Sequence, residues 1–175
     1  MSAIEIHTQQ GHWQHFQKLW QTVKPFLHKL KLIAISCPYT NTVTEYLKQI
    51  NSYIQPLDIP LIWQVDGRPM TGDIGRGTTN LTIKYAQQVK ELNFSGYIQL
   101  AGGTNEHTVH KFRSLDLPPS TISGVAYGSK GRKLIADILH QLESRSDHNQ
   151  LELHPDLLWQ AVAQVQVLIA PLKNL

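Results

Sequence analysis

Short apolar segments alternate five times with longer segments of helical period along this chain. The apolar segments have the length of buried strands and span residues 3–8, 31–38, 60–66, 97–100 and 121–127. Each is followed by a segment in which apolar residues recur at intervals of three and four, as one helix face requires: 13–26, 42–54, 78–92, 106–115 and 130–142. The pattern predicts an α/β protein built from five consecutive βα units.

Consecutive βα units predict a parallel sheet flanked by helices, because a crossover helix is the usual connection between parallel strands. Two architectures fit this pattern. One is an open doubly wound sheet, and the other is a part of a (β/α)8 barrel, which five strands cannot close. Both leave two sheet edges that have to be covered.

A polar segment separates the last helical stretch from the rest of the chain. Residues 144–150, SRSDHNQ, have the composition of a loop, and Pro155 lies where a first helical turn would begin. Residues 156–170 continue with helical spacing. We expect one domain over residues 1–143, and over residues 144–175 the polar loop and a terminal helix docked on that domain.

Composition argues against several classes of function. The net charge of +3 is scattered rather than gathered in a basic run, so nucleic-acid binding is not expected. No apolar run approaches the ~20 residues that span a bilayer, so no membrane partner is expected. A single cysteine, Cys37, cannot form an internal disulfide or a cysteine-ligated metal centre, which favours a cytoplasmic protein without a metal.

Glycines are concentrated where the fourth and fifth apolar segments end, and ligands of parallel α/β proteins gather at the carboxyl ends of strands. Adjacent glycines let a ligand approach the main chain, and the amides of a following helical turn attract anions. We predict a phosphate group held by residues Gly102, Gly103, Thr104, Gly128, Ser129, Lys130 and Arg132. The alternative is ordinary turn chemistry, with Thr104 or Asn105 as a helix cap.

A charged cluster follows the third apolar segment. Asp66, Arg68 and Asp73 are the candidates for catalysis or for a contact to a sugar, because packing gives no reason for charges at this place; the alternative is a salt-bridged loop. His7 at the end of the first segment is a candidate base or ligand, or an ordinary surface histidine.

Two further candidates are weaker. His107 and His110 stand three residues apart without other ligands nearby in the sequence, so we do not expect a metal there. Cys37 is either a reactive thiol or, as we favour, a small buried apolar residue.

Three segments carry a resemblance to a known family. IWQVDGRPMTGDIGRGTT (62–79), GYIQLAGGTNEHTV (96–109) and SGVAYGSKGRKLI (123–135) resemble the C-terminal region of the cyanobacterial light-dependent period family, LdpA. The resemblance implies a regulatory protein that conveys light or redox state to the circadian clock and associates with clock-input and oscillator proteins. It also implies an iron–sulfur region N-terminal to the matching part. The cysteine ligands of its 4Fe-4S clusters are absent here, so no cluster is expected on this chain.

The resemblance also bears on the fold. If the cluster-bearing half of the relatives supplies the first strands of a barrel, this chain supplies the C-terminal part, with the phosphate loops last, as in barrels. We therefore expect a partial TIM-barrel-like fold with an extra C-terminal helix. The expected partners are clock proteins or a cluster-bearing half that completes the barrel. We expect a regulatory protein that is not catalytic on its own.

An alternative function is a domain of oxidoreductase type that binds FMN or another phosphorylated cofactor. This alternative rests on an architectural likeness to flavin-dependent dihydropyrimidine and dihydroorotate dehydrogenases.

Overall fold

Five parallel strands in sequential order form the centre of the molecule. The computed structural model describes residues 2–67, 78–145 and 150–174. The strands are β1 (Ala3–His7), β2 (Leu32–Pro38), β3 (Leu61–Asp66), β4 (Tyr97–Ala101) and β5 (Gly124–Val125), and each pairs with the strand before it. The predicted α/β class and parallel sheet are confirmed.

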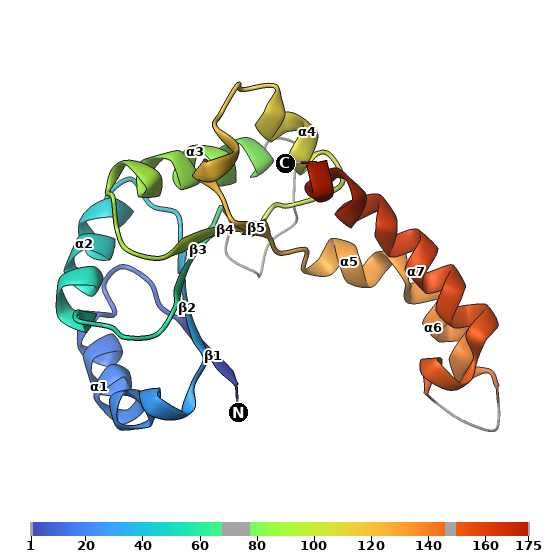
Figure 1. Ribbon diagram of the computed structural model, residues 1–175, viewed down its shortest axis with the longest axis horizontal. Coiled ribbons are helices and arrows are strands. Elements are labelled where there is room, and N and C mark those ends of the chain that lie inside the picture. Colours follow the sequence, from blue (N-terminus) through green and yellow to red (C-terminus); the bar gives the residue numbers. More distant parts are fainter. Residues whose placement is uncertain (1, 68–77, 146–149, 175) are drawn as a thin grey trace.

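In the described chain one α-helix follows each of the first four strands, and three follow β5. These helices are α1 (Trp13–Val23), α2 (Val43–Ile54), α3 (Thr78–Glu91), α4 (Thr108–Arg113), α5 (Ser129–Leu134), α6 (Ala136–Glu143) and α7 (Pro155–Ile169). Short 3-10 turns are η1 (Lys24–Lys29), η2 (Pro119–Thr121), η3 (Leu151–Leu153) and η4 (Ala170–Asn174). The sheet is curved, and α1, α2 and α3 all lie on its convex side (Figure 1). A doubly wound sheet would instead reverse its strand order and carry helices on both faces.

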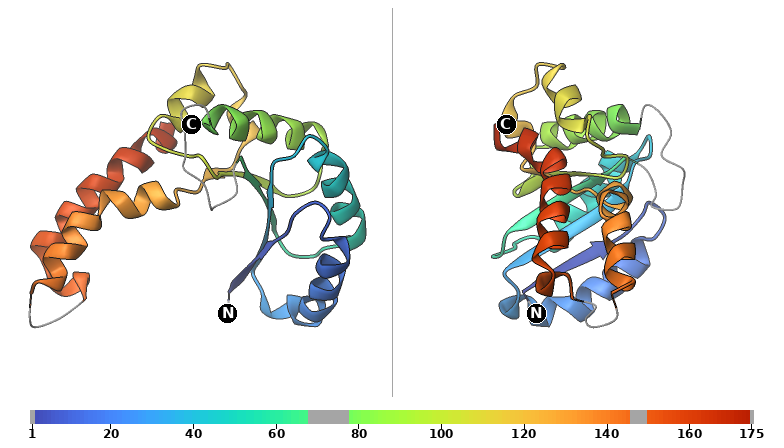
Figure 2. Two further views of the ribbon diagram at one scale, coloured as in Figure 1. Left: turned by 180° about the vertical axis from the view of Figure 1, so that it is seen from behind. Right: turned by 90° about the vertical axis from the view of Figure 1, so that its right-hand side faces the viewer.

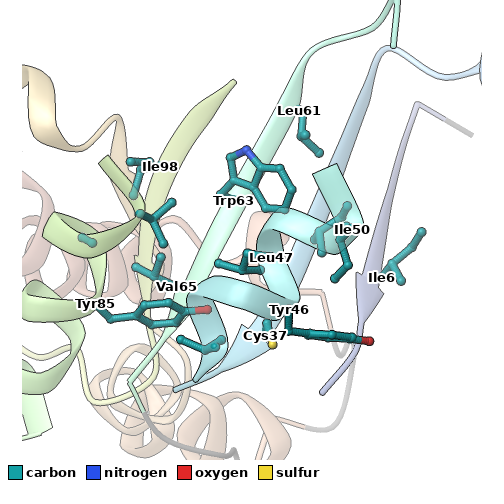
Figure 3. Packing of buried hydrophobic residues seen from close by; sticks show 14 of the residues in the cluster. Ile6, Cys37, Tyr46, Leu47, Ile50, Leu61, Trp63, Val65, Tyr85 and Ile98 are labelled. Carbon is teal, nitrogen blue, oxygen red and sulfur yellow. The ribbon is translucent and has the colours of Figure 1, made fainter. Parts of the chain in front are cut away.

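The main core lies between the sheet and α1–α3. Alternate strand residues point toward the helices, and those of β2 and β3 are almost completely buried: Ile33 at 0% exposure, Ile35 and Cys37 at 1%, Leu61 at 3%, Trp63 at 2% and Val65 at 1%. Leu47 and Ile50 of α2 meet this face (Figure 3). The core therefore holds the three helices in place and fixes the carboxyl ends of the strands.

The opposite face of the sheet, here called the inner face, carries the remaining strand residues. Cα partners across the strands form two rows: Glu5, Ala34, Ile62 and Tyr97, and then His7, Ser36, Gln64, Gln99 and Gly124. The Gln64 amide donates to Gln99 Oε1 at 2.9 Å. Tyr97 is 54% exposed, and Ile62 and Gln64 are half-buried. Apart from Ser36, which is 2% exposed, the inner face is thus less covered than the helix-facing one.

Helices α5, α6 and α7 project from the end of the sheet that β5 forms (Figures 1 and 2). A second, separate cluster of buried residues joins α6 and α7: Ile138, Leu142, Leu157 and Ala161. These three helices are here called the helical arm. The residues that follow α7 contact the main body, where the Arg113 guanidinium donates to the carbonyl of Pro171 at 2.9 Å. The terminal helix α7 packs on α5 and α6. The predicted division into residues 1–143 and 144–175 stays a prediction.

Several predicted boundaries were wrong. The predicted helix over residues 130–142 is interrupted at Ile135, where φ is −106° and ψ is 4°, so it forms α5 and α6. The predicted first helix ends at Val23 because Pro25, which lacks an N–H, lies at the start of the 3-10 turn η1, and Phe26 is 53% exposed instead of joining the apolar face. The predicted fifth strand is reduced to Gly124–Val125.

The fourth helix is also shorter than predicted. The His107 amide donates to Asn105 Oδ1 and the Asn105 amide to Thr108 Oγ1, both at 2.8 Å, so a side-chain-bonded turn takes the place of the first helical turn.

Candidate functional site

The two glycine loops predicted to hold a phosphate lie next to each other. They follow β4 and β5, which pair through Leu100 and Val125. The Thr104 hydroxyl donates to the carbonyl of Ala126 at 2.5 Å and so links one loop to the other. The structure therefore brings the two loops together at the carboxyl end of the sheet.

Packing against α3 explains why glycines follow β4. Gly102 and Gly103 have φ of +56° and +80°, where side chains other than glycine are strained. Their carbonyls accept hydrogen bonds from the Thr82 hydroxyl at 2.5 Å and the Thr79 hydroxyl at 2.8 Å. The loop is thus fastened to the threonine-rich start of α3.

The carbonyls of Gly102 and Gly103 bond to α3, whereas, in the described chain, the amides of the same loop do not. Within residues 2–67, 78–145 and 150–174, no hydrogen bond uses the amide of Gly102, Gly103 or Thr104 as a donor. Three successive amides of this kind can form a concave donor site for an anion. The glycine pair therefore has a packing role, and its amides can still serve a ligand.

The second loop differs from the first. A Cβ at Gly128 would meet nothing within 4 Å, so packing does not require glycine there. Ser129 begins α5, and Arg132 belongs to the last turn of the same helix. The Lys130 ammonium lies 3.0 Å from Glu106 Oε1.

Glu106 adds a negative charge beside the loops. A hydrogen bond to its own backbone and a second one from Lys130 lower the pKa of this carboxyl. The ion pair with Glu106 offsets the positive charge that Lys130 would offer an anion. Arg132, the other cation among the residues predicted to bind phosphate, is not part of this ion pair.

Of the predicted charged cluster, only Asp66 lies in the described chain. It is the last residue of β3, it is buried at 6% exposure, and it is the Cα partner of Ala101. Arg68 and Asp73 lie outside the described residues. The catalytic role predicted for the three residues stays a prediction.

Sequence reasoning overlooked the threonines of α3, against which Gly67 after β3 and Gly103 after β4 pack. A Cβ at Gly67 would lie 2.0 Å from Thr82 Oγ1, and one at Gly103 would lie 2.6 Å from the Cβ of Thr78. Thr78, Thr79 and Thr82 are all buried at the start of α3. The unusual threonine content of TTNLT could have drawn attention to this contact.

Cys37 is part of the main core. It is 1% exposed, and burial is the main cause that raises the pKa of its thiol to about 12. The thiolate, which is the reactive form of cysteine, is therefore almost absent at neutral pH.

The histidine candidates lie in solvent. His7 Nε2 is 3.2 Å from Glu5 Oε1, and the side chain of His7 is 56% exposed. His107 stands before α4 and His110 within it. Among the described residues, no group of three or more histidine, cysteine or acidic side chains is placed to hold a metal ion.

Two cavities lie at the other end of the sheet. Their volumes are about 330 and 350 Å³, both are lined by Gly96 and Tyr97, and they open at the amino ends of β3, β4 and β5. They are therefore separate from the glycine loops, which present a surface of backbone groups.

This protein is of the α/β class, with five parallel strands in sequential order in a curved sheet and two adjacent glycine loops at the carboxyl end of that sheet. The family model described as "Light dependent period A C-terminal domain" matches residues 1–171, so the chain belongs to the LdpA family. The chain is 42% identical over 178 residues to "Light dependent period A" of Synechococcus elongatus (strain ATCC 33912 / PCC 7942 / FACHB-805).

That match covers 99% of this chain and 50% of the relative, so the chain spans about half the length of the curated relative it matches. No solved structure matches the chain. No helix in the described chain is long and apolar enough to cross a membrane.

Proposed function

We propose that this chain is a regulatory domain in the light-dependent control of a circadian period. The observation that carries the proposal is the match of almost the whole chain to a relative whose name describes that role. The test uses a Synechococcus strain that lacks its own protein and receives a chimera in which this chain replaces the matching half. We expect the chimera to restore the wild-type period. A period equal to that of the deletion strain, with the chimera at normal abundance, would reject the proposal.

The second part of the proposal is that the loops after β4 and β5 bind a phosphate group. It is supported by the amides of Gly102, Gly103 and Thr104, which donate to no other residue of the described chain, by the link from Thr104 to Ala126, and by the open space at Gly128. Inorganic phosphate added to isotope-labelled protein should shift the NMR signals of these amides.

A variant pair makes this test specific. Gly128→Val places a side chain in the open space beside the loops and should weaken phosphate binding by about tenfold or more, which corresponds to about 1.4 kcal/mol. Gly131→Ala is the control, because its Cβ would meet Tyr127 Cβ at an ordinary 3.7 Å. Equal phosphate affinity in both variants would reject the site.

FMN is the natural probe for the alternative function. The loops offer donors for its phosphate, while the two cavities of about 330 and 350 Å³ lie at the other end of the sheet, away from those donors. Protection against thermal unfolding by FMN but not by phosphate would favour the oxidoreductase alternative.

The proposed partners follow from the family. We propose clock-input and oscillator proteins, and a cluster-bearing half that completes a barrel with this chain as its C-terminal part. A redox role would depend on that other half, because the single cysteine of this sequence is buried in the core.

A further inference from the structure

We propose that the free edge of β1 pairs with a parallel strand from the half of an LdpA-type protein that this chain does not span, and that this half covers the inner face. The proposal deepens the partner part of the proposed function and rests on it, but it does not depend on the phosphate site. It concerns three features of the described chain: the β1 edge, the inner face and the order of the strands.

The edge of β1 offers an alternating set of backbone groups. The Thr8 amide donates to the carbonyl of Ser36 at 2.9 Å, so Thr8 directs its amide toward β2. Alternate residues of a strand repeat the same orientation, so Ile4 and Ile6 also bond to β2. The N–H and C=O groups of Ala3, Glu5 and His7 then face away from the sheet. An added strand can take up these groups.

The inner face has the character of a surface that is normally covered. Parallel sheets occur almost only with both faces buried. Here Ile33 and Ile35 on the helix side are 0% and 1% exposed, while Tyr97 on the inner face is 54% exposed. Most inner-face residues of the described chain are apolar or uncharged, and the Glu5–His7 ion pair lies at the edge strand.

The strand order indicates which segment fits. Each of the five strands lies beside the one that precedes it in the sequence. Right-handed crossovers of the same kind would place a strand that precedes β1 against its free edge. The family model is that of a C-terminal domain and half of the relative is uncovered by this chain, so the relative has residues on that side of the match.

Amide hydrogen exchange tests the pairing in intact proteins. The amides of Ala3, Glu5 and His7 should exchange freely in the 175-residue chain. In the full-length Synechococcus protein, the amides of the segment that aligns with residues 3–7 should exchange more slowly by about tenfold or more, as paired amides do. Equal exchange in the two proteins would overturn the proposal. A self-associated 175-residue chain with protected β1 amides would also overturn it, in favour of a second copy as the occupant.

Variants provide a second measurement. In the chimera described above, Tyr97→Arg introduces a charge into the face to be covered and should lower the Tm, while the same change in the isolated chain should leave the Tm unchanged. Glu5→Pro removes an outward amide and should act in the same way, since proline is tolerated where the N–H faces away from the sheet. Gln14→Arg on the exposed side of α1 is the control and should be neutral in both proteins.

Equal effects of Tyr97→Arg in the isolated chain and in the chimera would also overturn the proposal. The exchange experiment and the test of the proposed function can fail separately. A chimera that does not restore the circadian period, together with slow exchange of the β1 amides in the full-length protein, would reject the regulatory function and retain the strand pairing.

Discussion

A Cβ placed on Gly103 would lie only 2.6 Å from the Cβ of Thr78 at the start of α3. The distance is shorter than side chains can tolerate, and the neighbouring hydroxyl of Thr79 already donates to the carbonyl of Gly103 at 2.8 Å. The loop after β4 therefore needs glycine in order to pack on α3, whether or not a ligand is present.

Gly103→Ala should destabilise the protein by about 2 kcal/mol or more, because it combines a left-handed backbone conformation with overpacking. Urea unfolding measures the change. Gly131→Ala is the matched control, since it adds a methyl group in helix α5 and should be neutral or stabilise by up to about 1 kcal/mol. Equal stability of Gly103→Ala and the unchanged protein would contradict the packing role.

The thiol of Cys37 should not react with a thiol reagent in the folded protein at pH 8. Burial raises its pKa to about 12, so the thiolate is scarce and the sulfur is inaccessible. In denaturant the same thiol should react at the rate of an ordinary cysteine. Rapid, complete labelling of the folded chain would show that Cys37 is available for redox chemistry.

The carboxyl of Asp156 should titrate well below an ordinary aspartate. The Arg145 guanidinium donates to both its oxygens, at 3.0 and 2.5 Å, and this is the main cause that lowers the pKa of Asp156 from 3.8 to about 2. A lowered pKa means that the pair contributes stability above pH 3.8 and loses it as the pH falls toward 2. NMR titration should place the midpoint near 2, and Arg145→Gln should return it toward 3.8. The same midpoint in both proteins would exclude the ion pair in solution.

The helical arm should loosen independently of the sheet. Leu157 is 1% exposed in the small cluster that joins α6 and α7, whereas Leu47 is 2% exposed in the main core. Leu157→Ala should increase hydrogen exchange in α6 and α7 and leave α2 unaffected. Leu47→Ala should instead lower global stability by about 2–5 kcal/mol. Uniform loss of protection after Leu157→Ala would show that arm and sheet unfold as one unit.

The α/β class, the parallel sheet and the positions of β1 to β4 could be read from hydrophobic period, because burial of one helix face and of short apolar strands is a local property of the sequence; β5 is much shorter than the period predicts. The same local reasoning placed both glycine loops at the carboxyl end of the sheet. It failed at Ile135 and at Phe26, where the helix boundary depends on backbone angles and on Pro25 rather than on apolar spacing.

The sequence pattern could not predict which residues bond to each loop, because these residues come from distant segments of the chain. Thr82 meets Gly102 across twenty residues and Thr104 meets Ala126 across twenty-two, and a hydrogen bond of this kind leaves no periodic trace in the sequence. The pairing of Lys130 with Glu106 and the separate core of the helical arm are of the same type. Apolar spacing thus set the sequence of helices and strands, whereas the packing of α3 against the segments after β3 and β4 determined why Gly67 and Gly103 are needed.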